Sequence, residues 1–388
     1  MKKKIALLLS AVLCLTMILG ACSGSKSVPE PKPEEPAASE ASPTEQNSTA
    51  TDEVEPMKIG FAFNGVVNSS AWLKTLDNAR IYVEENCENV TTQSVENVMD
   101  GSDVVRVFNE FINDGCRIVV GTSFSFLEYM LEIAAEHPEV VFLNASGYDT
   151  ADNLSVFIGR LEDAKYLAGM VAGSTTESNM IGYCSSMPFA DPVKQVNAFA
   201  LGVKAVNPDA KVHLLWSNSF YDPATDRLCA NTLIDQGCDV ITQDLDSSVP
   251  VQTAEERGVW AIASHYDMSE YAPTKQLTAT IWEWGPWVAK TVEEVRNGTF
   301  KGSWNELTFA DGAMRLAAFN DAVSDEIIQK VEETKELFKN DEKWVFEGPI
   351  YDNEGNLRVA EGETLKGEDL YVMDWLVDNV VGSVTSTQ

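Results

Sequence analysis

Residues 58–63 have the sequence Lys-Ile-Gly-Phe-Ala-Phe, and they are followed by an amphipathic segment at 71–85 and a second short apolar run at 92–95. A strand, a helix and a strand at this spacing form a parallel pair that is joined by a crossover helix. The same alternation continues along most of the chain. We therefore predict an α/β fold built on doubly wound parallel sheets.

The alternation extends to about residue 144 and starts again near residue 180. Two doubly wound lobes account for this break more economically than one sheet of nine strands. The carboxyl ends of the strands in both lobes would then face a shared cleft, which is where α/β folds bind their ligands. Further strands are expected at 118–120, 140–143, 180–183, 211–216, 240–243, 259–263 and 277–281, and further helices at 104–114, 126–136, 164–174, 193–205 and 224–236.

Each lobe is expected to contain two separate stretches of the chain. Lobe 1 takes about 57–160 and about 278–320, and lobe 2 takes about 161–277 and the C-terminal segment. The short stretches 155–160 and 278–287 are predicted to cross between the lobes. A charged amphipathic helix and a peripheral hairpin are expected at 321–339 and 351–362.

The composition excludes a protein that binds nucleic acid as a polymer. Lys and Arg number 28 against 60 Asp and Glu, so the formal net charge is −32. Phosphate backbones are bound by clustered Lys and Arg, and a field this negative repels both DNA and an anionic membrane surface. Hydrophobic residues make up 44% of the chain, so a packed core can still form.

The first 22 residues have the features of a secretory signal. Lys2, Lys3 and Lys4 precede an apolar run at 5–19 that is too short for a membrane span. The run ends in Leu-Gly-Ala-Cys22, which resembles a bacterial lipobox, in which the Cys is acylated and becomes the mature N-terminus. An ordinary cleavage site with a chance Cys is the alternative. We predict an extracytoplasmic protein that acyl chains on Cys22 anchor to the bacterial cell membrane.

Residues 23–56 are rich in Ser, Pro, Glu, Ala and Thr and contain no aromatic residue. Such a composition predicts a disordered tether between the anchor and the folded part, residues 57–388. Five cysteines follow the tether, and none of them forms a C-x-x-C motif, so no zinc or redox site is expected. Buried thiols are the main expectation, and a Cys229–Cys238 bridge is the alternative.

Catalytic signatures are absent from the sequence. It contains three histidines and lacks H-E-x-x-H, G-x-S-x-G, P-loop and G-x-G-x-x-G motifs. No pair among the many carboxylates is singled out as an acid and a base. We expect neither an enzyme nor a bound cofactor or metal.

Aromatic and polar residues instead gather in the loops that follow predicted strands. Taken singly, each aromatic fits core or rim packing. Taken together with Asn and Asp at their edges, they suit a flat, neutral ligand such as a nucleobase, which stacks on aromatic rings. The candidate ligand-binding residues are Asn64, Asn68, Trp72, Phe124, Phe189, Trp216, Phe220, Asp222, Tyr266, Asp267, Trp282 and Trp284.

Four stretches resemble the basic membrane protein (BMP) family, which comprises substrate-binding lipoproteins of ABC transporters and includes purine nucleoside receptors. They are the opening Lys-Ile-Gly-Phe-Ala-Phe-Asn-Gly with Trp72, the stretch 181–202, Trp-Ser-Asn-Ser-Phe-Tyr-Asp-Pro at 216–223, and Thr-Ile-Trp-Glu-Trp-Gly-Pro at 280–286. The resemblance covers about residues 57–319. It implies the two-lobed fold of type I periplasmic binding proteins, a purine ligand and a membrane permease as partner.

The resemblance also implies roles for single residues. Asn64 or Asn68 corresponds to the group that holds the base edge, and Trp72 and Phe124 correspond to aromatics that follow it. Phe220 resembles the aromatic that stacks on the base from lobe 2, and Asp267 resembles the acid near the ribose. Trp282 stands near the position of a Lys in nucleoside receptors and matches a branch associated with free purine bases. We therefore expect a purine, with the base favoured over the nucleoside.

Other functions remain open on the sequence alone. The same fold could serve a surface sensor or adhesin, and Asp267 could act as an acid in a nucleoside hydrolase. Sugars and riboflavin-like rings also stack on Trp. Asp267 could also cap a helix, because Met268-Ser-Glu follows it.

Overall fold

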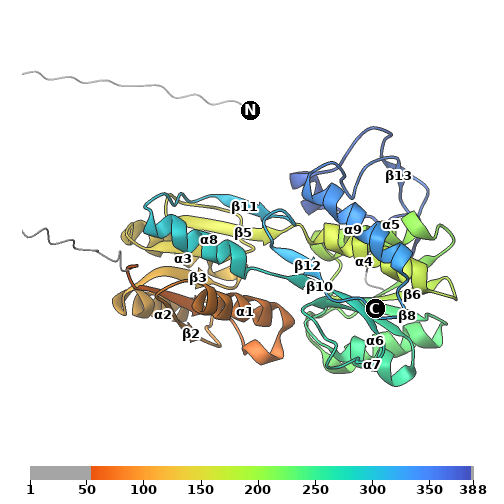
Figure 1. Cartoon of the computed structure of the whole chain (residues 1–388), viewed down its shortest axis with the longest axis horizontal. Coiled ribbons are helices and arrows are strands. Elements are labelled where there is room, and N and C mark those ends of the chain that lie inside the picture. Colours follow the sequence, from red (N-terminus) through yellow and green to blue (C-terminus); the bar gives the residue numbers. More distant parts are fainter. Residues whose placement is uncertain (1–53, 386–388) are drawn as a thin grey trace, which may run out of the picture. The chain divides into compact units, whose positions relative to one another are not determined.

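The computed structural model describes residues 54–385, which form two α/β lobes, each built on one sheet of mostly parallel strands (Figure 1). The predicted α/β class with two parallel-sheet lobes is therefore confirmed. The predicted signal peptide with Cys22, and the tether up to residue 53, lie outside the described residues. In the described part of the chain, no helix has both the length and the apolar character that a membrane span requires.

The sheet of lobe 1 has six strands in the order β11-β5-β4-β3-β1-β2, and all of its neighbours pair in parallel. β1 lies between β2 and β3, so the winding reverses beside β1 and leaves a crevice at the carboxyl ends of β1 and β3. The strands are β1 (Met57–Ala62), β2 (Val90–Val95), β3 (Cys116–Gly121), β4 (Val141–Ala145), β5 (Leu154–Gly159) and β11 (Trp304–Leu307).

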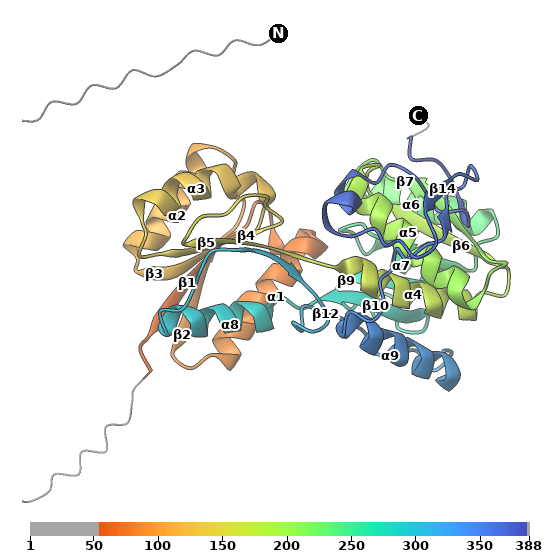
Figure 2. The same ribbon diagram turned by 90° about the horizontal axis from the view of Figure 1, so that it is seen from above.

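Two helices cover each face of this sheet, α1 and α8 on one side and α2 and α3 on the other (Figure 2). The hydroxyl of Ser70 caps α1 by accepting a hydrogen bond from the Leu73 amide. Because α1 follows β1, its first turn starts at the carboxyl edge of the sheet. The helices are α1 (Ala71–Asn86), α2 (Ser102–Asn113), α3 (Leu127–Glu136) and α8 (Gly285–Arg296), with short 3-10 turns at Val67–Ser69 and Phe124–Phe126.

The sheet of lobe 2 has seven strands in the order β12-β10-β9-β8-β6-β7-β15, and β12 alone among them pairs antiparallel. The winding reverses beside β6, which leaves the corresponding crevice at the carboxyl ends of β6 and β8. The strands are β6 (Met180–Ser185), β7 (Lys211–Trp216), β8 (Val240–Gln243), β9 (Trp260–His265), β10 (Gln276–Trp282), β12 (Met314–Leu316) and β15 (Val380–Val381).

The helices of lobe 2 form two further layers. In Figure 1, α4, α5 and α9 lie on one side of the sheet and α6 and α7 lie on the other. The predicted charged helix is confirmed as α9, which Ser324 caps. The helices are α4 (Leu161–Thr175), α5 (Ala190–Val206), α6 (Pro223–Asp235), α7 (Val249–Arg257) and α9 (Asp325–Lys339).

The chain crosses between the two sheets three times. It leaves β5 for α4 at Arg160, leaves β10 for α8 at 283–284, and leaves β11 for β12 through 308–313. The prediction that lobe 1 takes about 278–320 is wrong at both ends, because β10 and β12 pair in the sheet of lobe 2. Strand pairing, which joins residues far apart in the chain, decides this boundary.

The C-terminal segment closes over lobe 2. The predicted hairpin is confirmed by the antiparallel pair β13 (Ile350–Tyr351) and β14 (Leu357–Val359). A turn of 3-10 helix, Gly367–Val372, follows, and β15 then extends the sheet beside β7. The buried Asn197 side chain of α5 holds this segment, because it donates to the Trp375 carbonyl at 2.8 Å and accepts from the Val377 amide at 2.9 Å.

The cysteines of the described part are all free. The alternative of a Cys229–Cys238 bridge is therefore wrong, and both of these thiols are buried. Burial raises the pKa of Cys229 to about 11 and that of Cys238 to about 12. Such thiols stay protonated and unreactive near neutral pH.

Helices α4 and α5 approach each other at glycines. A β-carbon at Gly169 would lie 2.0 Å from the Phe199 carbonyl oxygen, and one at Gly202 would lie 1.9 Å from the Tyr166 carbonyl oxygen. Backbone atoms at these distances cannot move aside as a flexible side chain can. The two glycines therefore set the spacing of the helices that cover one face of lobe 2.

We expect Gly202→Ala to lower the free energy of unfolding by about 1–3 kcal/mol, because the added methyl group must push α4 and α5 apart. Chemical denaturation measures this change. The matched control is Ala205→Ser, which adds one heavy atom on the exposed face of the same helix. Equal stabilities of the two variants would contradict the close packing at Gly202.

Candidate functional site

The carboxyl edges of the two sheets face each other because the chain crosses there. β5 ends at Gly159 and leads directly into lobe 2, and β10 ends at Trp282 and leads directly into lobe 1. The two crevices beside β1 and β6 lie on these edges. The loops that carry the predicted ligand-binding residues follow the strands at the same edges, so the fold positions them around the space between the lobes.

Three of the predicted residues form one aromatic cluster where the chain crosses between the lobes. The rings of Trp282 and Trp284 stack with centroids 4.5 Å apart, and the edge of Trp72 meets both. Trp282 is 6% exposed and Trp284 is fully buried, whereas Trp72 is half-buried. A β-carbon at Gly159 would lie 2.0 Å from the Trp282 ring, so the lack of a side chain there makes room for the indole.

The indole nitrogens of this cluster all have protein partners. Trp72 donates to the Thr122 carbonyl at 3.0 Å and Trp284 donates to the Thr75 hydroxyl at 3.0 Å. Trp282 donates to Nδ1 of His265 at 3.2 Å. The cluster therefore forms part of the frame between the lobes, and its edge at Trp72 is the part that remains accessible.

His265 connects this cluster to the sheet of lobe 2. Because its Nδ1 accepts from Trp282, the ring proton resides on Nε2, which donates to the Asp244 carbonyl at 3.3 Å. Burial lowers the pKa of His265, so the neutral ring is favoured. The residue also adopts a φ of 71°, a conformation that few residues other than glycine and asparagine adopt readily.

Three of the predicted aromatic residues are exposed in loops that follow strands of the two sheets. Phe124 is 63% exposed in the loop after β3, and Phe189 and Phe220 are 49% and 46% exposed in the loops after β6 and β7. The rings of Phe189 and Phe220 meet edge to face with centroids 6.2 Å apart. These rings therefore expose large apolar surfaces to solvent.

Two predicted residues are engaged elsewhere. The Trp216 indole donates to the Ser383 carbonyl at 2.7 Å, so the C-terminal segment holds it near the edge of the sheet. Asp222 is the N-cap of α6 and accepts from the amides of Ala224 and Thr225. Hydrogen bonds from Thr225 lower the pKa of Asp222. The structure thus gives both side chains local contacts that account for them.

Tyr266 and Asp267 follow β9 at the edge of lobe 2. The Lys74 ammonium of α1 lies 4.9 Å from the centre of the Tyr266 ring. Asp267 is exposed, and its Oδ1 accepts from the Ser269 amide and from the Gln276 side chain. The alternative of a helix cap is wrong, because no helix begins at this turn. The Oδ2 atom has no hydrogen-bond partner within residues 54–385.

Asn64 and Asn68 lie in the loop after β1, and both are exposed. Their amides make no hydrogen bond to other residues of the described chain, so they keep their donors and acceptors for a ligand or water. Of the predicted set, Asn64, Asn68, Phe124, Phe189, Phe220 and Asp267 thus offer accessible groups, Trp72 and Tyr266 offer part of a ring, and the other four are buried or locally bound.

A buried polar layer beneath the site was not expected from the sequence. Lys165 of α4 is 1% exposed and donates to the Gln243 carbonyl and to the Ser264 hydroxyl, both at 2.8 Å. Burial lowers the pKa of Lys165 to about 8 and raises that of Asp244 to about 6. Asp244 accepts from the Ser185 hydroxyl and from the Ser186 amide. This network fixes the ends of β6, β8 and β9. Polar residues at or directly after the ends of these strands were the sequence signal that could have revealed it.

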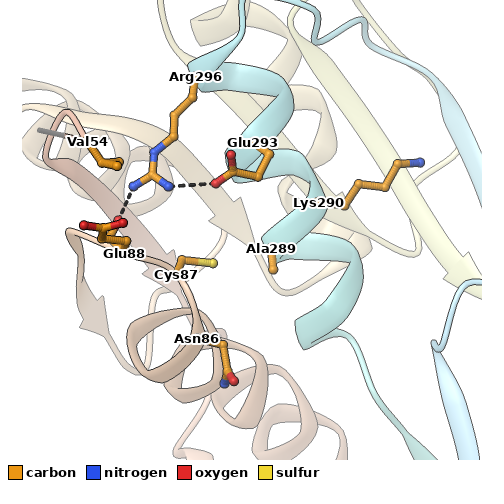
Figure 3. A pocket seen from close by; sticks show the side chains of 8 residues that line it. All are labelled: Val54, Asn86, Cys87, Glu88, Ala289, Lys290, Glu293 and Arg296. Carbon is orange, nitrogen blue, oxygen red and sulfur yellow. Dashed lines mark hydrogen bonds and ion pairs between the residues drawn. The ribbon is translucent and has the colours of Figure 1, made fainter. Parts of the chain in front are cut away.

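A hollow of about 390 Å³ lies elsewhere, between the end of α1 and α8. Figure 3 shows the side chains that line it. None of the predicted ligand-binding residues lines it. Asn86 at this end of α1 is about 21 Å along the helix from Trp72, at 1.5 Å per residue. Arg296 donates across one wall to the Glu88 carbonyl and to Glu293. Among residues 54–385, no group of three or more His, Cys, Asp or Glu side chains is arranged to hold a metal ion.

Comparisons with known proteins agree with this architecture. Residues 57–353 match the model of a family described as "ABC transporter substrate-binding protein PnrA-like". A purine-binding protein of Brucella abortus is 34% identical over 84% of this chain and 93% of its own length. A putative ABC transporter glucose-binding protein of Haloferax volcanii is 33% identical over 78% of each chain.

A solved structure gives the same fold. The solute-binding protein of an ABC transporter system from Conexibacter woesei superposes with a TM-score of 0.67, at 21% identity, over 74% of this chain and 98% of its own. Residues beyond 353, which contribute β14 and β15, lie outside the family match.

We expect the free energy of unfolding to decrease as the pH drops below about 6.5, because of His265. The unfolded chain takes up a proton there that the buried ring resists, so stability from this group is complete above pH 6.5 and is lost below it. His265→Asn keeps an acceptor for Trp282, tolerates the positive φ and does not titrate.

Chemical denaturation at pH 8 and pH 5 measures this effect. Relative to His265→Asn, the native protein should lose up to about 2 kcal/mol between these values. A constant offset between the two proteins at both pH values would show that His265 does not titrate as its burial requires.

Proposed function

The chain belongs to the PnrA-like family of ABC transporter substrate-binding proteins, and from this premise we propose that it captures a purine base or nucleoside between its lobes. Proteins of this family bind solutes and are not enzymes, and those of ABC importers act outside the cytoplasm. The ligand would then pass to a membrane permease. The lobes would close around the ligand by a hinge motion at the three crossings.

The exposed rings of Phe124, Phe189 and Phe220 are the observation that carries the proposal. Three phenylalanines about half or more exposed at facing loops leave apolar surface that a flat ligand would cover. One stacked base contributes about 1–3 kcal/mol per aromatic face. Two faces and a few hydrogen bonds at the edges reach the roughly 8 kcal/mol of a micromolar complex.

The polar groups that remain free suit the edges of a neutral base. The amides of Asn64 and Asn68 offer donors and acceptors, and Asp267 offers a carboxylate oxygen. The chain carries a formal charge of −32, which disfavours phosphorylated nucleotides. A neutral purine meets both conditions.

The contacts of Trp282 favour a base over a nucleoside. Its indole N–H is already bonded to His265, and its ring is stacked on Trp284 and packed on Gly159. This residue therefore offers no free donor to a ribose hydroxyl. In the proposed complex a ribose would have to compete with the base for the free groups of Asn64, Asn68 and Asp267.

A sugar is the second candidate ligand. The relative from Haloferax volcanii is described as a putative glucose-binding protein and is almost as similar to this chain as the purine-binding relative. Sugar rings also stack on aromatic side chains. Glucose therefore belongs in the ligand panel beside the purines.

We expect purified residues 54–388 to bind adenine, guanine or hypoxanthine with dissociation constants at or below the micromolar range. Trp72 lies at the accessible edge of the Trp cluster, so its fluorescence should change on closure. Titrations with purine bases, their nucleosides and glucose measure this, and mass spectrometry of material released from denatured protein identifies the native ligand. A response to glucose alone would overturn the purine assignment.

Phe220→Ala should weaken purine binding by about 1–3 kcal/mol, because one stacking face is lost. Isothermal titration calorimetry gives the affinity of each variant. Tyr351→Ala is the matched control, since this ring is similarly exposed, at 45% against 46% for Phe220, but lies on the peripheral hairpin. If both variants bind purines as the native protein does, Phe220 does not stack on the ligand.

We also propose that residues 1–22 are a lipoprotein signal, that acyl chains on Cys22 anchor the protein and that residues 23–56 tether the two lobes. Cys22→Ser should shift the protein from the membrane fraction to the soluble fraction of the host cell, because the thiol that carries the diacylglycerol is gone. Cys14→Ser, within the predicted signal, is the control. Membrane retention of Cys22→Ser would exclude this anchor. Adjacent permease and ATPase genes would favour transport over a sensor or an adhesin.

A further inference from the structure

Asp246 makes an unusual set of contacts for a residue of lobe 2. It lies in the loop after β8, and its Oδ2 accepts from the Ser70 hydroxyl at 2.9 Å while its Oδ1 accepts from the Trp72 amide at 3.2 Å. Its carbonyl accepts from the Ala71 amide at 3.1 Å. Three consecutive residues of lobe 1 thus bond to one residue of the other lobe.

These contacts complete the cap of α1. Ser70 accepts from the Leu73 amide while it donates to Asp246, and the amides of Ala71 and Trp72 are satisfied by Asp246. The first amides of a helix have no partner within it, and the helix dipole favours a negative charge at this end. Separation of the lobes would expose these amides to water and would remove the carboxylate from the dipole.

The side chain of Asp246 has no partner within its own lobe among residues 54–385. Both carboxylate oxygens bond only across the gap, to Ser70 and Trp72. A carboxylate that served the folding of lobe 2 would have partners there. Its bonds are therefore formed when the lobes approach and broken when they separate.

The same residue contacts both sets of aromatic candidates. The Asp246 amide donates to the Phe220 carbonyl at 2.8 Å, which ties its loop to the aromatic rim of lobe 2. Across the gap, Trp72 donates through its indole to Thr122, two residues before Phe124. Lys74, two residues further along α1, lies over the Tyr266 ring of lobe 2.

We propose that Asp246 is the latch that holds the two lobes closed by capping α1 across the cleft, and that it thereby positions the aromatic rims of the lobes on the ligand. This inference rests on the proposed function, because ligand capture between the lobes is the step that the latch would serve. Asp246 is a positioning residue, since it acts through Phe220 and Trp72. Loss of the latch lowers the fraction of closed protein, and the apparent affinity falls by the same factor.

Distances between the lobes in ligand-free protein test the latch directly. Spin labels are attached at Glu132→Cys on α3 and Leu228→Cys on α6, two exposed positions in different lobes. Cys87→Ser removes the partly exposed thiol, and the other four cysteines of the described chain are buried. Pulsed electron paramagnetic resonance then gives the distribution of distances with no ligand present.

Asp246→Ala should move the main population to longer distances and weaken purine binding about tenfold. Ser70→Ala, which removes one of the three bonds, should have a smaller effect in the same direction. Asp246→Asn keeps an acceptor oxygen and should largely restore both the distances and the affinity. Asp209→Ala removes an exposed carboxylate from a turn of the same lobe and should change neither.

An unchanged distance distribution in Asp246→Ala would overturn the latch, even if the affinity fell. Thermal unfolding of each variant confirms that the lobes are folded. If the distances lengthen in Asp246→Ala but the native protein binds none of the purines, the latch stands and the proposed function fails. The two ideas are therefore tested separately.

Discussion

Parallel strand pairing is the constraint on which the rest of this structure depends. Because neighbouring strands run in the same direction, each strand ends at the same edge of its sheet, and the chain must cross a face before it can add another. Both sheets use these edges for their crossings between lobes. The loops that follow these strands therefore lie at the edges where the chain crosses, and the helix that follows β1 bonds through its first turn to the other lobe.

The candidate aromatic residues form two groups that differ in burial. Trp282, Trp284 and the inner part of Trp72 form a packed frame in which each indole nitrogen has a protein partner. Phe124, Phe189 and Phe220 are held by loops and leave much of their surface in water. The first group is stabilised by packing within the protein. The exposed rings of the second group would gain packing energy only when a ligand covers them. This difference separates the buried frame from the exposed rings to which we assign ligand recognition in the proposed function.

The buried polar layer of lobe 2 holds the strand ends on which the aromatic frame rests. Lys165, Asp244 and His265 each form a hydrogen bond with a backbone group at or next to a strand end. Trp282, at the crossing between the lobes, donates to His265 and so joins this network. Unpaired polar groups at such depth are costly, so the network specifies one arrangement of the strand ends. Asp246, two residues after Asp244, bonds to Trp72 of lobe 1, and its amide donates to the Phe220 carbonyl in its own lobe.

Alternating apolar runs and amphipathic segments determined the class of fold, most helices and most strands of both sheets, because these depend on local periodicity. They missed β11, β12 and β15, and the stretch 155–160, which was expected only as a crossing between the lobes, is largely β5. The sequence analysis also missed α7 and α8, and both of these helices have Pro in their first turn. Local sequence also identified the loops that hold the candidate site. Which sheet takes β10, which aromatics are buried, and which side chains of those loops are already bonded were decided only by tertiary structure. Trp216 and Trp284 illustrate this, since their partners Ser383 and Thr75 lie more than a hundred positions away, and no local pattern encodes such a contact.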